Sequence, residues 1–195
     1  MPRIATIERT TRETTIRLHL NLDGNGHVQS ATGIGFFDHM LEHLGRHGLF
    51  NLQVNCQGDL HIDAHHSVED VGICLGQALH QALGDKAGIR RFGHCILPMD
   101  ETLVTAAVDL SGRPACVWHA DLPRVQLGAF PAELAEEFWR AVVCHGRFNL
   151  HVLLHHGRNV HHMVEAIFKA CARALRMAVE PDPRTQDIPS TKGLL

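Results

Sequence analysis

Two short motifs in the chain combine side chains that can bind metal ions. Residues 63–69 read Asp-Ala-His-His-Ser-Val-Glu, and residues 159–165 read Asn-Val-His-His-Met-Val-Glu. Because Asp and Asn are preferred helix N-caps, each motif predicts a helix with its histidine pair in the first turn. Neighbouring histidines on a helix diverge by about 100°, while the glutamate three or four residues later lies near both. One histidine can therefore share a metal ion with the glutamate while the other faces a second ion.

The histidine and glutamate side chains of the motifs indicate which metal ions they could bind. Imidazole nitrogen and carboxylate oxygen suit a borderline divalent ion such as manganese, iron or zinc. A single motif of this kind would more often belong to a solvated helix surface. Two copies in the same register favour a metal centre instead. The candidate ligands are His65, His66, Glu69, His161, His162 and Glu165.

The composition is that of an ordinary globular chain, apart from 17 histidines beside no tyrosine. A chain of 195 residues can bury roughly 70% of its unfolded surface, so it can build a core without disulfides or structural metals. Its 45% hydrophobic and 20% charged residues argue against disorder. A net charge of −3 and the absence of a basic block argue against a nucleic-acid partner.

Cysteine usage and the N-terminal residues predict the compartment. The six cysteines are widely spaced without a Cys-x-x-Cys pair, which favours apolar fillers in a reducing compartment over disulfides or a zinc-thiolate site. The start lacks an apolar signal core, and no apolar run reaches the length needed to span a membrane. We therefore expect a soluble, cytoplasmic protein that does not bind membranes.

The elements around the first motif are predicted from periodicity. A β-hairpin is predicted from apolar alternation at 16–20, the turn residues Asp-Gly-Asn-Gly at 23–26 and a return strand near Val28. Asp38 is placed to cap a short helix that ends near Gly45 or Gly48. A half-buried strand then covers 50–56, and a long helix from Ala64 to Leu83 carries the motif, with Gly84 as its C-cap.

The second half repeats this order. A hairpin is predicted from 104–110 and 115–118 around a turn at 111–114, followed by a helix from Pro131 to about His145. Residues 145–152 match residues 47–54 at six of eight positions, at an offset of 98. The tail from residue 181 onward holds three prolines, so we expect no regular helix there and a frayed terminus.

These observations predict an internal duplication with halves at 1–90 and 91–195 in one compact subunit. The fold class is α+β, each half being an antiparallel-rich sheet with helices on one face. Both long helices carry apolar faces that we expect to be buried. Those faces consist of Val71, Leu75, Ala78, Leu79 and Ala82 in the first helix, and Val164, Ile167, Phe168, Cys171 and Leu175 in the second.

Taken together, these residues resemble the imidazoleglycerol-phosphate dehydratase family of histidine biosynthesis, in its short single-activity form. The similarity covers nearly the whole chain, and the paired motifs together with the tail are highly specific. The segments that carry it are 9–14, 36–41, 47–50, 58–70, 91–93, 109–114, 159–165, 168–169 and 189–193. The resemblance implies a ribosomal protein S5 domain 2-like fold and a homo-oligomer of 24 subunits. It also implies two manganese ions in each active site, at subunit interfaces.

Ligand roles follow from the resemblance position by position. His39, His65, His66 and Glu69 are the implied ligands in the first half, and His161, His162 and Glu165 those in the second. Glu137 stands where many members have a histidine, and it is the repeat counterpart of His39. A carboxylate can bind manganese, so Glu137 is either a ligand or a group that supports one.

The resemblance also implies a reaction, the dehydration of imidazole glycerol phosphate to imidazole acetol phosphate. The carbon that loses its proton has no neighbouring carbonyl, so the ring must supply electrons, held as an imidazolate between the two metal ions. Glu13 is the expected base, and His47 or a metal-bound water the expected acid. The expected phosphate-binding residues are Arg91, Arg113, Lys169, Ser190 and Lys192. Their guanidinium, ammonium and hydroxyl groups suit a phosphate.

Two alternatives use the same ligands. A dinuclear metallohydrolase would hydrolyse a phosphate or an amide with a metal-activated water. A histidine-rich metal-binding protein without catalysis would bind metal without turnover and would be indifferent to replacement of Glu13.

Overall fold

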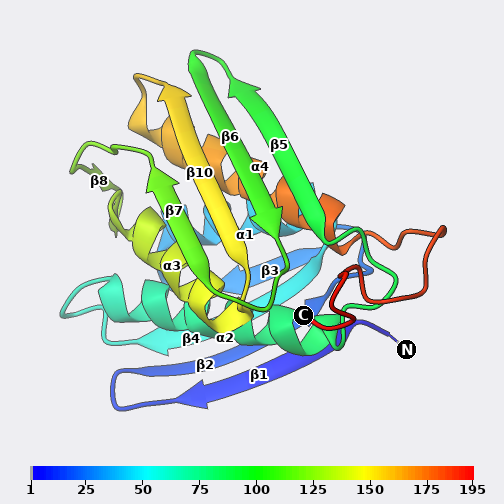
Figure 1. The fold of residues 1–195 in the computed structure, drawn as a ribbon. Helices are drawn as coiled ribbons and strands as arrows, with labels where there is room; N and C mark the ends of the chain where they lie inside the picture. Colours follow the sequence, from blue (N-terminus) through cyan, green and yellow to red (C-terminus); the bar gives the residue numbers. More distant parts are fainter. Residues whose placement is uncertain (1) are drawn as a thin grey trace.

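The computed structural model describes residues 2–195. Its first half contains β1 (Ile4–Thr10), β2 (Thr14–Asn21), β3 (Val28–Ala31), α1 (Gly35–Gly48), β4 (Asn51–Gly58) and α2 (His65–Leu83). Its second half contains β5 (Phe92–Met99), β6 (Thr102–Asp109), β7 (Ala115–His119), β8 (Gln126–Leu127), β9 (Phe130–Pro131), α3 (Leu134–Gly146), β10 (Asn149–His156) and α4 (Val160–Val179). Apart from the short β8–β9 ribbon, the two halves have the same order of elements (Figure 1).

The two main sheets also share one topology. The strand orders are β1-β2-β4-β3 and β5-β6-β10-β7. In each sheet the first two pairings are antiparallel, and the last strand, β3 or β7, lies parallel to its neighbour. The chain is thus a mixed α+β protein with antiparallel-rich sheets, as predicted.

Both predicted hairpins are wrong in their pairing. Val28 lies in β3, which pairs with β4 rather than with β2, and the true first hairpin joins β1 to β2. The backbone N–H groups of Asn25 and His27 donate to the side-chain oxygen of Asn51, which fixes the glycine-rich loop on β4. In the second half, Asn149 donates to the carbonyl oxygen of Arg113 and β7 pairs with β10. Each such loop therefore leads into a strand, β3 or β7, that a crossover helix connects to its parallel neighbour.

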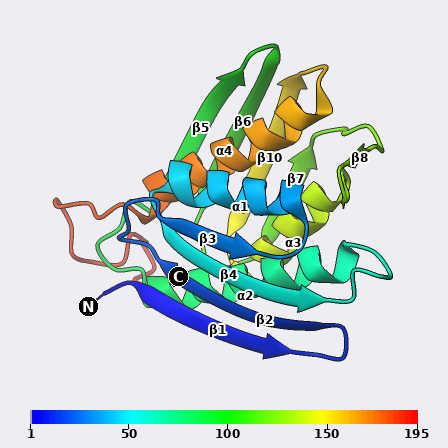
Figure 2. The same cartoon turned by 180° about the vertical axis from the view of Figure 1, so that it is seen from behind.

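Four helices fill the space between the two sheets (Figures 1 and 2). The α2 helix packs on β1, β2 and β4, whereas α4 packs on β5, β6 and β10. The α1 helix lies against α4, and α3 lies against α2. The apolar faces predicted for α2 and α4 are buried throughout. The helix pair α2–α3 meets closely because Gly72 and Gly76 have no side chain: a Cβ at Gly76 would lie 2.5 Å from the carbonyl oxygen of Val142.

The helix starts differ in part from the predictions. The α4 helix is capped as predicted, since the Asn159 side chain accepts the N–H of His161. Asp63 accepts the N–H of His65 in the same way, just before α2 begins. Asp38 does not cap α1; it lies in the first turn and accepts the N–H of Thr32. Pro131 belongs to β9, so α3 begins at Leu134.

The tail contains no helix, as predicted, but it folds back on the chain instead of fraying. The N–H of Gly88 donates to the carbonyl oxygen of Asp187, and the N–H of Asp182 donates to the carbonyl oxygen of Gly88. This arrangement places residues 181–195 beside the start of β5. None of the helices in the described part of the chain is long and apolar enough to span a membrane.

Candidate active site

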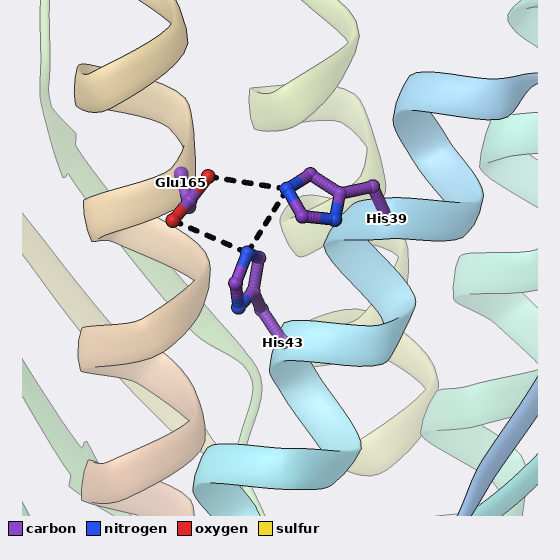
Figure 3. A group of neighbouring side chains, drawn as sticks. All are labelled: His39, His43 and Glu165. Carbon is purple, nitrogen blue, oxygen red and sulfur yellow. Dashed lines mark hydrogen bonds and ion pairs between the residues drawn. The ribbon is translucent and has the colours of Figure 1, made fainter.

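The first group of candidate ligands lies in the seam between α1 and α4 (Figure 3). We call His39, His43, His161 and Glu165 the α1–α4 cluster. One Glu165 oxygen lies 3.3 Å from Nε2 of His39 and 3.0 Å from Nε2 of His161. The other oxygen lies 3.2 Å from Nε2 of His43, which is itself 3.1 Å from Nε2 of His39. Three histidines on two parallel helices thus surround one carboxylate.

The protonation states in this cluster leave the nitrogen of His43 and the carboxylate of Glu165 able to bind a cation. Burial lowers the pKa of His43 to about 4, so at neutral pH its ring is neutral and a nitrogen lone pair remains available. Burial alone would raise the pKa of Glu165, but the hydrogen bond from Lys169 and the positive charge of that side chain contribute to lowering it to about 2. Ligand atoms of His39, His43 and Glu165 lie within 4.8 Å of one another. The neutral His43 ring beside an ionised carboxylate suits a divalent cation, and His39 offers a further ring nitrogen, so the residues present fit a manganese ion.

His47 extends the same row on α1. Its ring centroid lies 5.6 Å from that of His43. Burial lowers its pKa, and the positive charges of Lys169 and Arg173 lower it further. Lys169, expected at the phosphate, instead donates to Glu165 over 2.5 Å and lies beside Met99.

The second group lies at the start of α2. We call Glu13, Asp59, His65, His66 and Glu69 the α2 cluster. Nε2 of His65 lies 4.0 Å from Glu69, and Nδ1 of His66 lies 2.9 Å from Asp59. The hydrogen bond to Asp59 raises the pKa of His66. Nε2 of His66 faces Glu13 at 3.8 Å, so the predicted base stands beside a predicted ligand.

In both histidine pairs, the two histidines contact different carboxylates, and the pattern is the same in each pair. The first histidine of each pair faces the glutamate four residues later, as in the 3.0 Å contact of His161 with Glu165. The second faces a carboxylate from elsewhere: Nδ1 of His162 lies 2.9 Å from Glu101. The rings within the pairs are nearly perpendicular, at 89° and 84°. Adjacent histidines therefore diverge as expected for a helix.

Glu137 is half-buried in the first turn of α3. The α3 helix packs on α2 as α1 packs on α4. Glu137 thus occupies on α3 the position that His39 occupies on α1.

Four of the five predicted phosphate-binding residues lie together. Arg91, Arg113, Ser190 and Lys192 line a pocket of about 610 Å³ at the tail, which we call the basic pocket. Arg91 is held by Asp109, 2.7 Å from its Nε, and donates through Nη1 to the carbonyl oxygen of Pro189. The folded-back tail therefore brings a hydroxyl and an ammonium group to two guanidinium groups.

The basic pocket and the α1–α4 cluster lie at opposite ends of α4. The backbone N–H of Arg91 donates to the carbonyl oxygen of Ala178, near the C-terminus of α4, whereas Glu165 lies in the second turn. Thirteen residues of helix between them correspond to about 20 Å.

His43 and Asp59 of these clusters were not predicted from the sequence, and neither was Glu101 beside His162. His43 follows His39 by four residues, so helical spacing alone could have found it. Glu101 directly precedes β6, and Glu13 directly precedes β2, and in both cases the strand begins with a threonine, which is a repeat signal for Glu101. Asp59 carries no signal of this kind.

Comparison with known proteins identifies the chain. Two solved imidazoleglycerol-phosphate dehydratases share its fold. The enzyme from Staphylococcus aureus is 40% identical with a TM-score of 0.83, and the match covers 91% of this chain and 99% of that one. The enzyme from Pyrococcus furiosus is 33% identical with a TM-score of 0.84, and the match covers 97% of this chain and 100% of that one. The relative from Granulibacter bethesdensis, bearing the same name, is 60% identical over the full length of both chains. That from Jannaschia sp. is 58% identical over 99% of this chain and 100% of its own.

The fold and the relatives thus make the chain a dehydratase, an enzyme that eliminates water from its substrate. The model of the imidazoleglycerol-phosphate dehydratase family matches residues 32–175, and the chain belongs to that family.

Proposed function

We propose that this enzyme dehydrates imidazole glycerol phosphate to imidazole acetol phosphate in histidine biosynthesis, using two manganese ions that hold the imidazole as an imidazolate. The observation that carries this proposal is the pairing of two histidine–carboxylate clusters with a basic pocket in a chain of this family. The clusters suit a metal-bound imidazole, and the basic pocket suits a phosphate monoester.

The contacts of the histidine pairs, together with the repeat position of Glu137, support one arrangement of the two ions. His39, His161 and Glu165 would bind one ion, with His43 close by. His65, Glu69 and Glu137 would bind the other. His66 and His162 face away from their own glutamates, which leaves them free to complete the site of a neighbouring chain.

The distance along α4 supports a site shared between chains. Only three carbons separate the imidazole of the substrate from its phosphate oxygen, a reach comparable to one or two extended residues of about 3.6 Å each. About 20 Å of helix separates the α1–α4 cluster from the basic pocket. One substrate molecule can therefore engage both only if they come from different subunits. We propose a homo-oligomer of 24 subunits with active sites at the interfaces.

The proton transfers are assigned to groups of the chain. Glu13 is more than half exposed at the β1–β2 turn, where it can take the proton from carbon. His47 would hydrogen-bond the departing hydroxyl. Because burial lowers the pKa of His47, little imidazolium is present at neutral pH, so His47 orients the hydroxyl more readily than it protonates it.

The shared topology of the halves supports a gene duplication, with halves at 1–90 and 91–195 in one ribosomal protein S5 domain 2-like subunit. Six free cysteines, three of them buried, support a reducing cytoplasmic location.

A dehydration assay on metal-stripped protein, before and after addition of manganese, tests the proposed function. We expect turnover only with manganese, in a particle much heavier than the 21.6 kDa chain, and its loss in Glu13→Gln. Hydrolysis of a phosphate or amide would instead indicate a metallohydrolase. Metal binding without any turnover would indicate a metal-binding protein, and either result would overturn the proposal.

A further inference from the structure

The second histidine of each pair is held through Nδ1 by a carboxylate that lies outside the motif. For His66 this carboxylate is Asp59, just after β4, at 2.9 Å. For His162 it is Glu101, at the β5–β6 turn, also at 2.9 Å. The same relationship thus occurs twice, from different loops and with different acidic residues.

This relationship determines which ring nitrogen can bind a metal. A carboxylate can only accept, so the Nδ1 atom must carry a hydrogen, and the lone pair of the neutral ring then lies on Nε2. Both rings are partly exposed, at 31% for the His66 side chain and 26% for that of His162. The Nε2 atoms face Glu13 and Asp100 at 3.8 Å, so they point away from the holding carboxylates.

We propose that Asp59 and Glu101 are positioning residues, which fix His66 and His162 in the Nδ1–H tautomer and present Nε2 to a manganese ion. This proposal rests on the metal-dependent function proposed above. Groups that hold metal-binding histidines in this manner commonly change metal affinity by about 10- to 100-fold when they are removed.

The two carboxylates differ in the use of their second oxygen. Oε1 of Glu101 accepts the backbone N–H groups of Arg158 and Asn159, at 3.1 and 2.8 Å, directly before α4. Oδ1 of Asp59 is buried and has no hydrogen-bond partner among residues 2–195. The same amide substitution should therefore act differently at the two positions.

In Glu101→Gln, the single amide oxygen is retained by the two backbone N–H groups, which leaves the NH2 group facing Nδ1 of His162. The NH2 group donates, so His162 must change to the Nε2–H tautomer, which has no lone pair on Nε2 to offer to the metal ion. In Asp59→Asn, the amide can turn its oxygen towards His66, because no donor holds the other position. We expect Glu101→Gln to weaken one manganese site by about 10- to 100-fold, and Asp59→Asn to weaken binding by less than about fivefold.

The experiment titrates manganese into the metal-stripped oligomer by calorimetry and reads 15N-histidine tautomers by solid-state NMR of the metal-free protein. The matched control is Asp100→Asn, which removes a negative charge near Nε2 of His162 without touching Nδ1. Asn also tolerates the left-handed backbone of position 100, where φ is 47°.

Weak manganese binding and an Nε2–H signal in Glu101→Gln, absent from Asp100→Asn, would support the proposal. Equal affinities in Glu101→Gln and the native chain, or an unchanged tautomer, would overturn it. If the native chain binds no manganese, the proposed function fails. The tautomer measurement then still decides whether Asp59 and Glu101 position the rings.

Discussion

The backbone N–H of Arg91 donates to the carbonyl oxygen of Ala178 over 2.9 Å, which fixes the basic pocket at the C-terminal end of α4. The carboxylate of Glu165 lies near the opposite end of the same helix. A rigid helix therefore keeps the two halves of the expected substrate site apart within each chain.

Mixing two inactive variants tests this separation. Glu165→Ala disrupts the α1–α4 cluster, and Arg113→Ala weakens the basic pocket, so each homogeneous oligomer should lose nearly all dehydration activity. In a co-assembled equal mixture, about a quarter of shared sites would combine an intact cluster with an intact pocket from different chains. We expect recovery of up to about a quarter of native activity, measured after joint reassembly. No recovery above the sum of the separate variants would place both halves in one chain.

Glu137 should contribute to one of the two manganese sites. We expect Glu137→Ala to weaken one of two binding events at least about tenfold, as measured by calorimetry, because the ion loses an anionic ligand. Glu137→His should retain binding and shift the preference towards zinc, since imidazole suits zinc better than carboxylate does. Unchanged manganese affinity in Glu137→Ala would show that Glu137 is not a ligand.

The buried carboxylate of Asp70 should be important for stability. It accepts from Thr14 over 2.5 Å and lies 2.8 Å from a guanidinium nitrogen of Arg9, which joins β1 and β2 to α2. Asp70→Ala would leave a partly buried guanidinium unpaired, so we expect a loss of about 2 to 4 kcal/mol in the free energy of unfolding. Denaturant unfolding at fixed protein concentration measures this loss.

The exposed pair of Arg17 and Glu8 provides the comparison for Asp70. Glu8→Gln should change stability by less than about 0.5 kcal/mol, because solvent screens this pair. Equal effects of Asp70→Ala and Glu8→Gln would contradict a structural role for the buried pair.

Gly76 should be intolerant of a methyl group. A Cβ there would lie 2.5 Å from the carbonyl oxygen of Val142 and 2.7 Å from the nitrogen of Gly146, so Gly76→Ala must push α3 away from α2. We expect a loss of about 1 to 3 kcal/mol, measured by thermal unfolding. The control is Gly35→Ala at the start of α1, where a Cβ meets nothing within 4 Å. A loss in Gly35→Ala as large as that in Gly76→Ala would argue against steric overlap as the cause.

Local patterns predicted the four helices and several strands, but they missed β1, β5 and the β8–β9 ribbon, and they gave the wrong partners for β3 and β7. The turn residues at 23–26 are typical of a hairpin, yet the N–H groups of Asn25 and His27 donate to Asn51, which is 24 to 26 residues further along the chain. Apolar periodicity identifies a strand and its buried face, whereas pairing depends on such distant contacts. Topology was therefore harder to predict than helix position.

The candidate site shows the same limit. Helical spacing within the motifs correctly predicts that His161 lies beside Glu165 and that His162 diverges from it. The approach of His39 to Glu165 depends on the packing of α1 on α4, so the spacing of the residues did not predict it. Asp59 reaches His66 from a loop after β4, and no local pattern reports that approach.

The duplicated arrangement has a consequence for how subunits combine. The start of α4 and the start of α2 lie in different places on the same side of the molecule (Figure 2). If each start needs a histidine from another chain, every subunit is bivalent, and a pair of subunits joined through a single contact still leaves two starts unsatisfied. Addition can stop only when the last ends meet, as in a closed shell. Such a shell would assemble and dissociate cooperatively, because a defect at one subunit interface weakens the neighbouring interfaces.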